Sequence, residues 1–392
     1  MQINNHTIIR ILAIISYPFL PATTGGEIST LQILKYLSHQ HDVTVFTVEP
    51  YHEHYKHQTG DLKLVFGMPF KTSRYYNIRL ISTLQKLVKQ THAEWLFFDQ
   101  PWFGWIMWAL KFITGKKIFI RSNNIEYLRF KSMGKWFWQM LYVYEKWTYR
   151  AADLVVFVSE SERQKAIYEF DLKPERTLLT PYGVEIENLN QESPPVPAGT
   201  RSSILNLRSQ LGVADDEKMI LFFSTLSYYP NYEAVGFIAD NIYPLLKERT
   251  GFRFRIILCG KGLPGDIKKK LTDKPEISYL GFVDDISLYI DAADIMINPI
   301  LSGGGVKTKA IDTLARNQRV LSTRNGADGI DPAVCKDNLV IVEDGNWPAF
   351  ADAIVEWAGR PKNIPQEFYN MYGWPGIIKN LGVKLDQLDN LK

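Results

Sequence analysis

The stretch IMINPILSGGGVKTKAIDTLARNQRVLST, residues 295–323, carries the pattern that decides the fold. It opens with a short apolar run at 295–298, passes three consecutive glycines, and continues as a helical segment from around Val306. A second apolar run follows at 320–322. Because a helical segment joins two short apolar runs, the stretch predicts a βαβ unit with parallel strands buried on both faces.

The same alternation of apolar runs and helical segments extends in both directions along the chain. It predicts two α/β units, each a parallel sheet covered by helices. After the first strand and its loop, a helix is expected through Leu31, Leu34 and Leu37. The predicted strands of the first unit are Ile8–Ile15, Asp42–Val48, Trp95–Phe98, Lys117–Ile120 and Leu154–Val158. Those of the second unit are Met219–Phe223, Phe254–Leu258, Ile277–Leu280, Ile295–Asn298, Val320–Ser322 and Leu339–Ile341.

A chain of 392 residues is too long for one ordinary domain, which agrees with two units. The segment NLNQESPPVPAGTRSS, residues 188–203, holds three prolines among small and polar residues, a composition typical of a linker. We therefore predict an N-terminal domain over residues 1–190, a linker over 191–204, a C-terminal domain over 205–365 and a terminal helix over 366–392.

Composition indicates a globular protein, with 46% hydrophobic and 22% charged residues. A net charge of +3 is too small to argue for a nucleic-acid partner. Cys259 and Cys335 are too few for a disulfide framework and fit a reducing cytoplasm. The run Ile8–Ile15 is short and rich in β-branched residues, which favours a buried strand over a signal peptide. No apolar stretch reaches the length of a membrane-spanning helix, so a soluble or peripheral protein is expected.

Two glycine-containing loops follow predicted strands. In the first loop, Gly25 and Gly26 allow the backbone to turn sharply and to approach a ligand closely. Ligands of doubly wound sheets bind at the carboxyl ends of the strands, where this loop lies. The loop does not match the dinucleotide fingerprint, so a nicotinamide cofactor is not indicated. A purely structural turn is the alternative.

The second loop contains three consecutive glycines before Val306 at the expected start of a helix: Gly303, Gly304 and Gly305. Backbone N–H groups at the positive end of a helix suit a pyrophosphate. Lys307 or Lys309 could add a positive charge for the same anion. Asp312 could accept hydrogen bonds from ribose hydroxyls. The alternative is a flexible turn followed by a solvated helix face.

Several blocks spaced along most of the chain resemble the retaining GT-B glycosyltransferases, in particular glycosyltransferase family 4, also called group 1. In the first half they are PxxPxxxGGE at Pro18–Glu27, RSNNIEY at Arg121–Tyr127 and AADLVVFVSESE at Ala151–Glu162. In the second half they are LSYYPNYEAVGF at Leu226–Phe237, ILCGKG at Ile257–Gly262, YLGFVDDISLYIDAADIMINP at Tyr279–Pro299 and GGGVKTKAIDTLA at Gly303–Ala315. Their order and spacing together carry the resemblance.

The resemblance implies two Rossmann-like domains facing a cleft, and a terminal helix that returns to the N-terminal domain and docks through Trp374. It implies transfer of a hexose from a UDP- or GDP-type nucleotide sugar, with retention of the anomeric configuration. The acceptor would be a glycan or a lipid-linked glycan, as in surface polysaccharide synthesis. The donor diphosphate would bind mainly to the C-terminal domain and the acceptor to the N-terminal one, with no dedicated cofactor or metal.

The chain departs from the family pattern at three places. Of the Glu-x7-Glu pair of many relatives, the second position is Asp312 and the first falls on Gly304. Asn123 stands where relatives often have histidine, and its amide cannot act as an acid or base. Ser227 and Asn231 stand near the place of a basic phosphate ligand, which transfers that role to the lysines after the glycines. The predicted catalytic residues are Lys309, Lys307 and Asn123, and the predicted donor-binding residues are Gly25, Gly26, Ser227, Asn231, Gly303, Gly304, Gly305, Val306 and Asp312.

Three histidines in YHEHYKHQ, at positions 52, 54 and 57, lack a fourth ligand at fixed spacing, so a surface loop is preferred to a metal site. The segment 102–150 carries six tryptophans and nine basic residues, against only Glu126 and Glu145. Aromatic and basic residues together suit the boundary of an anionic membrane. One hypothesis is that this segment rests on the inner leaflet and meets a lipid-linked glycan. The other is that the aromatic residues fill the core or a partner interface.

Two further functions remain open from the sequence alone. A nucleotide-sugar epimerase can share the double-Rossmann form, but it would need acid–base residues that the sequence does not locate. A non-catalytic protein of the same fold, which binds glycan or partners only, fits the missing glutamate and histidine. The three functions differ in their products: a transferred sugar, an epimerised nucleotide sugar, or no turnover.

Overall fold

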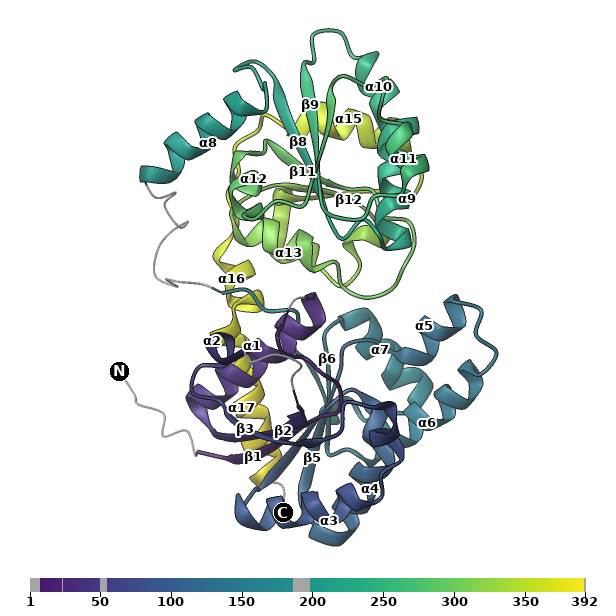
Figure 1. Ribbon diagram of the computed structural model, residues 1–392, viewed down its shortest axis with the longest axis vertical. Helices are drawn as coiled ribbons and strands as arrows, with labels where there is room; N and C mark the ends of the chain where they lie inside the picture. Colours follow the sequence, from purple (N-terminus) through teal and green to yellow (C-terminus); the bar gives the residue numbers. More distant parts are fainter. Residues whose placement is uncertain (1–7, 23, 50–54, 186–197, 391–392) are drawn as a thin grey trace. The chain divides into compact units, whose positions relative to one another are not determined.

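The computed structural model describes residues 8–22, 24–49, 55–185 and 198–390. The chain forms two compact units (Figure 1). Unit 1 comprises residues 1–185 and 372–392, and unit 2 comprises residues 186–371. Each unit contains one parallel sheet with helices on both faces, as the alternating apolar runs predict.

The sheet of unit 1 has seven parallel strands in the order β3-β2-β1-β4-β5-β6-β7. The strands are β1 (Arg10–Ile15), β2 (Asp42–Val48), β3 (Lys63–Met68), β4 (Trp95–Asp99), β5 (Lys117–Ser122), β6 (Leu154–Phe157) and β7 (Thr177–Leu179). All five predicted strands are present, and the two that the sequence analysis missed are β3 and β7. Both lie at the edges of the sheet, where strands are short or partly exposed and give no continuous apolar run.

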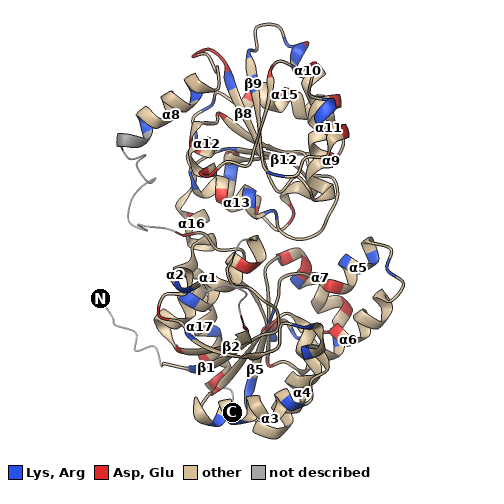
Figure 2. Cartoon of the chain, in the orientation of Figure 1, with Lys and Arg blue, Asp and Glu red and all other residues tan. Residues whose placement is uncertain are grey.

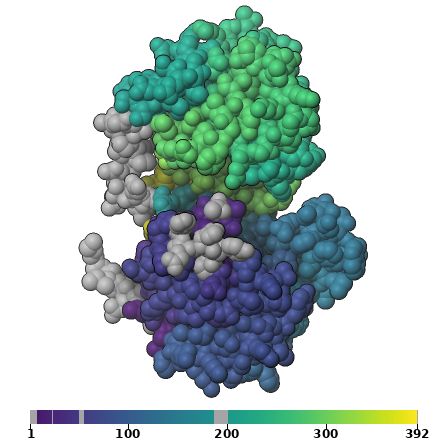
Figure 3. Space-filling view, in the orientation of Figure 1, coloured from purple at the N-terminus to yellow at the C-terminus, as the bar shows by residue number. Residues whose placement is uncertain are grey.

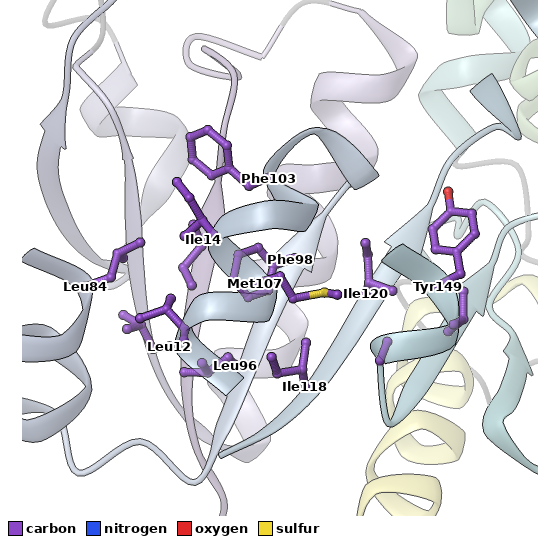
Figure 4. Packing of buried hydrophobic residues seen from close by; sticks show 14 of the residues in the cluster. Leu12, Ile14, Leu84, Leu96, Phe98, Phe103, Met107, Ile118, Ile120 and Tyr149 are labelled. Atoms are coloured by element: carbon purple, nitrogen blue, oxygen red, sulfur yellow. The ribbon is translucent and has the colours of Figure 1, made fainter. Parts of the chain in front are cut away.

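The helices of unit 1 are α1 (Gly25–Gln40), α2 (Lys56–Thr59), α3 (Arg79–Gln90), α4 (Gly104–Thr114), α5 (Glu126–Ser132), α6 (Trp138–Ala151), α7 (Glu160–Phe170) and α17 (Trp374–Asn390). Alternate residues of β1 point to opposite faces, with Leu12 and Ile14 in one core and Ala13 in the other. Helices α3, α4 and α6 cover the first face, where Met107 of α4 packs near Phe98 of β4 (Figure 4). Helices α1 and α17 cover the second face.

The terminal helix returns to unit 1, as the resemblance implies. The predicted helix over 366–392 is divided into α16 (Gln366–Tyr372) and α17, and Gly373 between them forms a β-bridge with Val184. Trp374 is 2% exposed and stacks on Tyr36, with ring centroids 5.9 Å apart. A Cβ atom at Gly183 would lie 2.4 Å from the Trp374 ring, so the indole fits only because position 183 has no side chain.

The sheet of unit 2 has six parallel strands in the order β10-β9-β8-β11-β12-β13, and all six were predicted. They are β8 (Lys218–Phe223), β9 (Phe254–Cys259), β10 (Ile277–Gly281), β11 (Ile295–Asn298), β12 (Val320–Thr323) and β13 (Leu339–Val342). The helices are α8 (Ala198–Gln210), α9 (Tyr229–Phe237), α10 (Tyr243–Lys247), α11 (Gly265–Lys269), α12 (Ile286–Ala292), α13 (Thr308–Ala315), α14 (Pro332–Cys335) and α15 (Trp347–Trp357).

The predicted linker, 191–204, differs from the structure in its second half. Residues 191–197 lie outside the described part of the chain, but 198–204 form the first turns of α8. Leu207, further along this helix, is 7% exposed and packs in the core of unit 2 together with Ile290 of α12. The burial of this apolar side chain stabilises a helix whose first turns have the small and polar composition of a linker.

Both sheets reverse their strand order at one place, between β1 and β4 in unit 1 and between β8 and β11 in unit 2. At such a switch point, the connections leave the two central strands in opposite directions and open a crevice at their carboxyl ends. The loop with Gly25 follows β1, and the loop with three glycines follows β11. The topology therefore places both predicted glycine loops beside a switch point.

Candidate functional site

In unit 2, the loops after β8 and β9 pack directly against each other. The Leu226 N–H donates to the Lys261 carbonyl at 2.9 Å. Gly260 has a φ of +137°, and a Cβ atom there would lie 1.8 Å from the Ser224 carbonyl oxygen. Only glycine can adopt this positive φ and leave room for the Ser224 carbonyl oxygen, so the close contact fixes the course of the two loops.

The loop after β11 packs against the start of α9. Gly303 has a φ of +85°, and a Cβ atom there would lie 2.9 Å from Pro230 Cγ. Ser302 Oγ donates to the Glu233 carboxylate at 2.8 Å, which ties the loop to the same helix. These contacts bring the glycine loop next to the segment that holds Ser227 and Asn231.

Ser227 and Asn231, predicted to contact the donor, differ in their surroundings. Asn231 Nδ2 donates to the Thr225 carbonyl at 2.9 Å, so its amide closes the turn before α9. Ser227 is exposed, and its Cβ faces Gly262, where an added Cβ would lie 2.8 Å away. Asn231 thus supports the loop, and Ser227 presents a hydroxyl at its surface.

The glycine loop is held by Lys307. Its Nζ donates to the carbonyl oxygens of Gly303, Gly304 and Gly305 at 3.0, 3.4 and 2.8 Å. Within the described residues, the backbone N–H groups of Gly304, Gly305 and Val306 donate no hydrogen bond. Lys307 therefore neutralises the carbonyl dipoles of the loop and leaves these N–H groups open to an anion.

Lys309, in the first turn of α13, has a buried ammonium group. Its Nζ lies 4.4 Å from the centroid of the Phe222 ring and has no hydrogen-bond partner among the described residues. Burial, together with the nearby charge of Lys307, lowers the pKa of Lys309 to about 7. A buried cation without a counterion is unfavourable, and an anion placed against it would relieve that cost.

Asp312 lies three residues further along α13, on the side of the helix that carries Lys309. Its side chain keeps some exposed area, yet the carboxyl group is largely removed from water, and this burial raises its pKa to about 7. Within the described residues it has no hydrogen bond or ion pair. Because its oxygens are not used by the described residues, the ionised Asp312 carboxylate can accept hydrogen bonds from ligand hydroxyls.

A buried polar cluster fixes the strand ends below the glycine loop. Asn298 is fully buried, and its Nδ2 donates to Ser322 Oγ at 3.1 Å and to the Gly326 carbonyl at 2.8 Å. Thr323 Oγ1 donates to the Ile300 carbonyl at 2.6 Å. The sequence analysis missed this cluster, although a polar residue at the end of each apolar run was a signal for it.

In unit 1, α1 begins at Gly25 under a side-chain cap from Thr24. The Thr24 N–H donates to the Glu27 carboxylate at 2.9 Å, and the Thr24 side chain accepts from the Glu27 N–H, which completes a capping box. A Cβ atom at Gly26 would meet nothing within 4 Å. Packing therefore does not require glycine at position 26, and the first turn of α1 has open space beside it.

A buried ion pair lies below the first turns of α1. The Arg121 and Asp99 side chains are 2% and 0% exposed, with Nε 3.9 Å from Oδ1. Asp99 Oδ2 accepts from Tyr17 at 2.5 Å and from Thr30 at 2.7 Å, while Arg121 donates to Ser29 Oγ at 2.8 Å. Burial, with a further contribution from Asp99, raises the pKa of Tyr17 well above its usual value. This network ties α1 to the ends of β4 and β5.

Asn123 follows β5 in unit 1. Its Oδ1 is buried and has no hydrogen-bond partner among the described residues. The preceding residue, Ser122, accepts a hydrogen bond from Tyr149 at 2.9 Å and donates to the Asn124 carbonyl at 3.0 Å. The backbone around Asn123 is therefore held in place while its own amide oxygen is unused.

The start of α5, just after Asn123, is held by buried Glu145. The two carboxylate oxygens accept the N–H groups of Glu126 and Tyr127 at 2.8 and 2.7 Å. Burial, with the neighbouring charges of Glu126 and Glu162, raises the pKa of Glu145 to about 8. No sequence signal pointed to Glu145, because it lies in a helix nineteen residues after Glu126.

Comparison with known families agrees with this arrangement. A model described as "Glycosyltransferase Family 4" matches residues 23–188, and one described as "Glycosyl transferases group 1" matches residues 217–359. The two matches together cover most of the chain, one in each half. The chain belongs to the group 1, family 4-like glycosyltransferases.

Two curated relatives align with parts of this glycosyltransferase. An uncharacterized 44.6 kDa protein in the cps region of Klebsiella pneumoniae is 26% identical over 161 residues, or 40% of this chain and 41% of the relative. Alpha-monoglucosyldiacylglycerol synthase of Streptococcus pneumoniae is 27% identical over 152 residues, or 37% of this chain and 32% of the relative. The matches span less than half of either relative.

Solved structures share the fold over nearly the whole chain. A glycosyltransferase from Rickettsia africae has a TM-score of 0.71 at 15% identity and covers 98% of this chain and 100% of its own. Anabaena HepE in complex with UDP has a TM-score of 0.71 at 16% identity and covers 96% and 99%. Sucrose-phosphate synthase from Thermosynechococcus elongatus has a TM-score of 0.70 at 15% identity and covers 98% and 100%. These similarities establish the GT-B fold.

The predicted site residues of this glycosyltransferase fall into two sets. Unit 2 holds Ser227, Asn231, Gly303, Gly304, Gly305, Val306, Lys307, Lys309 and Asp312, and unit 1 holds Gly25, Gly26 and Asn123. Their roles in binding and catalysis stay predictions. Of the three histidines, His52 and His54 lie outside the described residues, and His57 is in α2. In the part of the chain that the structure describes, no helix has both the length and the apolar character needed to cross a bilayer.

Proposed function

We propose that this glycosyltransferase transfers a hexose from a nucleotide sugar to a glycan or lipid-linked acceptor and retains the anomeric configuration. The donor diphosphate binds at the glycine loop of unit 2. There, the N–H groups of Gly304, Gly305 and Val306 and the Lys309 ammonium neutralise its charge. Asp312 accepts hydrogen bonds from the ribose, and Lys307 keeps the loop in its binding conformation.

The observation that carries this proposal is the buried ammonium of Lys309, which has no hydrogen-bond partner among the described residues and lies in the first turn of the helix that follows the open backbone N–H groups. A cation in this position would bind a phosphate more strongly than an exposed lysine would, because the protein has already removed its water. With this charge in place, we expect the site to need no dedicated cofactor or metal.

In the proposed reaction, the bond between the anomeric carbon and the donor phosphate oxygen breaks, and the nucleoside diphosphate leaves with the bonding electron pair. The acceptor hydroxyl oxygen forms the new glycosidic bond and passes its proton to the oxygen of the leaving phosphate. Charge therefore builds up on the leaving phosphate in the transition state, where Lys309 and the loop N–H groups stabilise it. Asn123 would hydrogen-bond a sugar hydroxyl through its unused Oδ1.

The similar proteins support a choice of donor and acceptor. The HepE structure contains UDP, which favours a UDP-linked donor. One relative lies in a cps region and another is named for a diacylglycerol lipid, which favours an acceptor in surface glycan or glycolipid synthesis. Unit 1 would receive this acceptor near Asn123, at the cytoplasmic face of the membrane, and the first turn of α1 with Gly25 and Gly26 would contact the donor. Residues 102–150 would provide the membrane contact.

The test is a thermal-shift titration of the full chain with UDP, GDP, ADP, CMP and dTDP. A nucleotide at a hundred times its dissociation constant stabilises the protein by about 2.7 kcal/mol. We expect one nucleotide to stabilise the wild type and the control Lys269→Met, which changes an exposed lysine of α11, but not Lys309→Met. No stabilisation by any nucleotide, or equal stabilisation of Lys309→Met, would contradict the donor site.

Product analysis with the matching nucleotide sugar then tests the reaction. A sugar transferred to an added glycan or glycolipid with the donor's configuration supports the proposal. An epimerised nucleotide sugar would instead support the epimerase, and nucleotide binding without turnover would support a protein that only binds.

A further inference from the structure

Helices α4 and α6 of unit 1 expose a row of large apolar side chains. On α6, Met140 and Val143 are 66% and 65% exposed, and Trp147 follows at helical spacing on the same face. On α4, Trp108 and Phe112 are four residues apart, and Phe112 is 87% exposed. We call these five residues the α4–α6 face.

The two helices of the α4–α6 face form one continuous surface. The Trp108 and Trp147 rings stack with centroids 5.5 Å apart and planes within 3° of parallel. These two indoles are 44% and 41% exposed, so the stacked pair faces solvent. By contrast, Trp105 and Trp138 of the same segment are partly buried against the core. The structure thus divides the tryptophans of 102–150 between the core and the surface.

The α5–α6 hairpin extends this surface with basic residues. Figure 1 shows the hairpin at one side of unit 1, and Figure 3 shows it as a lobe there. Its connection carries Met133, Lys135 and Trp136, and Trp136 is 79% exposed. Lys131 and Lys135 are exposed and have no ion pair among the described residues. Figure 2 shows positive charge on α5 and along this connection.

No exposed carboxylate opposes these lysines from within the same segment. The acidic residues of 102–150 are Glu126 and Glu145, which are 3% and 1% exposed. On the neighbouring α7 side, Asp171 pairs with Arg150 at 3.3 Å, so this carboxylate is compensated within unit 1. Indoles and apolar side chains bordered by lysines without an ion pair among the described residues match the boundary of a bilayer with anionic head groups.

We propose that the α4–α6 face and the connection 133–136 dock unit 1 on an anionic lipid bilayer. The apolar side chains insert at the level of the head groups, and Lys131 and Lys135 contact their phosphates. This inference rests on the proposed function for its purpose, since docking would hold the acceptor domain where a lipid-linked acceptor lies. The binding itself depends only on this surface.

The test is co-sedimentation of the full-length protein with vesicles of equal parts phosphatidylcholine and phosphatidylglycerol, and with phosphatidylcholine alone, at low and high salt. We expect binding to the anionic vesicles that weakens with salt. Lys131→Gln and Lys135→Gln should each weaken binding about fivefold, the effect of one lysine near a charged membrane. Phe112→Ser and Trp136→Ser should weaken binding at both salt concentrations, because they remove apolar insertion.

Matched controls lie elsewhere in unit 1. Tyr168→Ser removes an aromatic ring that is 88% exposed on α7, and Lys86→Gln with Lys89→Gln removes two exposed charges from α3. The inference is overturned if wild type does not bind anionic vesicles at low salt, or if the controls lose as much binding as the surface variants. It is also overturned if, without lipid, wild type forms a dimer that Phe112→Ser disrupts.

Nucleotide stabilisation of the surface variants separates this inference from the donor site. Variants that keep the thermal shift but lose vesicle binding support the membrane surface. If wild type binds vesicles and no nucleotide stabilises it, the membrane surface stands and the proposed donor site fails.

Discussion

Replacing Lys309 with methionine removes a buried charge that no protein group neutralises. Lowering the pKa of Lys309 from its usual 10.5 to about 7 corresponds to several kcal/mol, at about 1.4 kcal/mol for each pH unit. Water penetration makes the actual cost of burying the Lys309 charge smaller than this figure. The methionine variant also loses the attraction between the ammonium and the Phe222 ring, which takes about 1 kcal/mol from its gain in stability. We therefore expect Lys309→Met to make the ligand-free protein more stable at pH 7, by about 1–3 kcal/mol.

The pH dependence of this effect has a definite sign. Between pH 7 and pH 10.5 the Lys309 amine is protonated in the unfolded chain and largely neutral in the folded one. The unfolded state then binds more protons, so the contribution of Lys309 to the free energy of unfolding rises with pH in this window. From pH 7 to pH 9 the wild type should gain about 2 kcal/mol relative to Lys309→Met, which has no amine to titrate.

Differential scanning calorimetry of both proteins at pH 7, 8 and 9 measures this difference. Each kcal/mol corresponds to about 2–4 °C in the melting temperature of a domain of this size. Lys269→Met, which changes an exposed lysine, should leave the melting temperature unchanged at each pH. A Lys309→Met protein that is less stable than wild type at pH 7 would contradict a destabilising buried charge at Lys309. A stability difference between the two proteins that does not change with pH would contradict it as well.

Three other substitutions test separate parts of the structure. Glu145→Gln should be less stable than wild type at pH 5, and this difference in the free energy of unfolding should shrink towards pH 8. The reason is that the folded state keeps the Glu145 proton up to about pH 8 while the unfolded chain releases it, so that wild type loses stability as the pH rises; urea unfolding at pH 5 and pH 8 measures the difference. Gly260→Ala should destabilise unit 2 by about 2–4 kcal/mol, since the added Cβ would collide with the Ser224 carbonyl oxygen. The control Gly265→Ala, whose Cβ would meet nothing within 4 Å, should leave the stability unchanged, and calorimetry compares the two variants. Trp374→Ala should destabilise unit 1 by about 3–5 kcal/mol in urea unfolding and leave nucleotide binding by unit 2 unchanged.

The fold was predictable because strands of a buried parallel sheet consist of continuous apolar residues, which are visible in the sequence. Each of the eleven strands predicted from such a run is present. One of them, β11, lies between β8 and β12 in the interior of its sheet. Strands β3 and β7 were not predicted because an edge strand is paired on one side only and need not be apolar throughout. The predicted linker includes the first turns of α8 because their residues are small and polar. The helix is stabilised by contacts further along the chain, at Leu207.

The sequence predicts a candidate site at the glycine loop of unit 2, but it does not show how the side chains there are held. Three glycines between a strand and a helix indicate an anion site, because such a loop can expose backbone N–H groups at the N-terminus of the helix. Lys307 and Lys309 looked equivalent in the sequence. In the structure, Lys307 bonds to the loop carbonyls, whereas Lys309 is buried over Phe222 without a partner. Asn231, predicted to contact the donor, closes a turn with its amide.

Local periodicity and motifs contiguous in the chain were therefore enough to predict the class of fold, the buried strands and the family. Tertiary contacts alone set the strand order of each sheet and bury Lys309 without a hydrogen-bond partner among the described residues. They also place Glu145 at the start of α5 and stack Trp108 on Trp147 in one exposed face. Each of these depends on burial and on contacts between residues far apart in the chain. The energy of a charge or an indole is set by what surrounds it, and the local sequence does not contain that information.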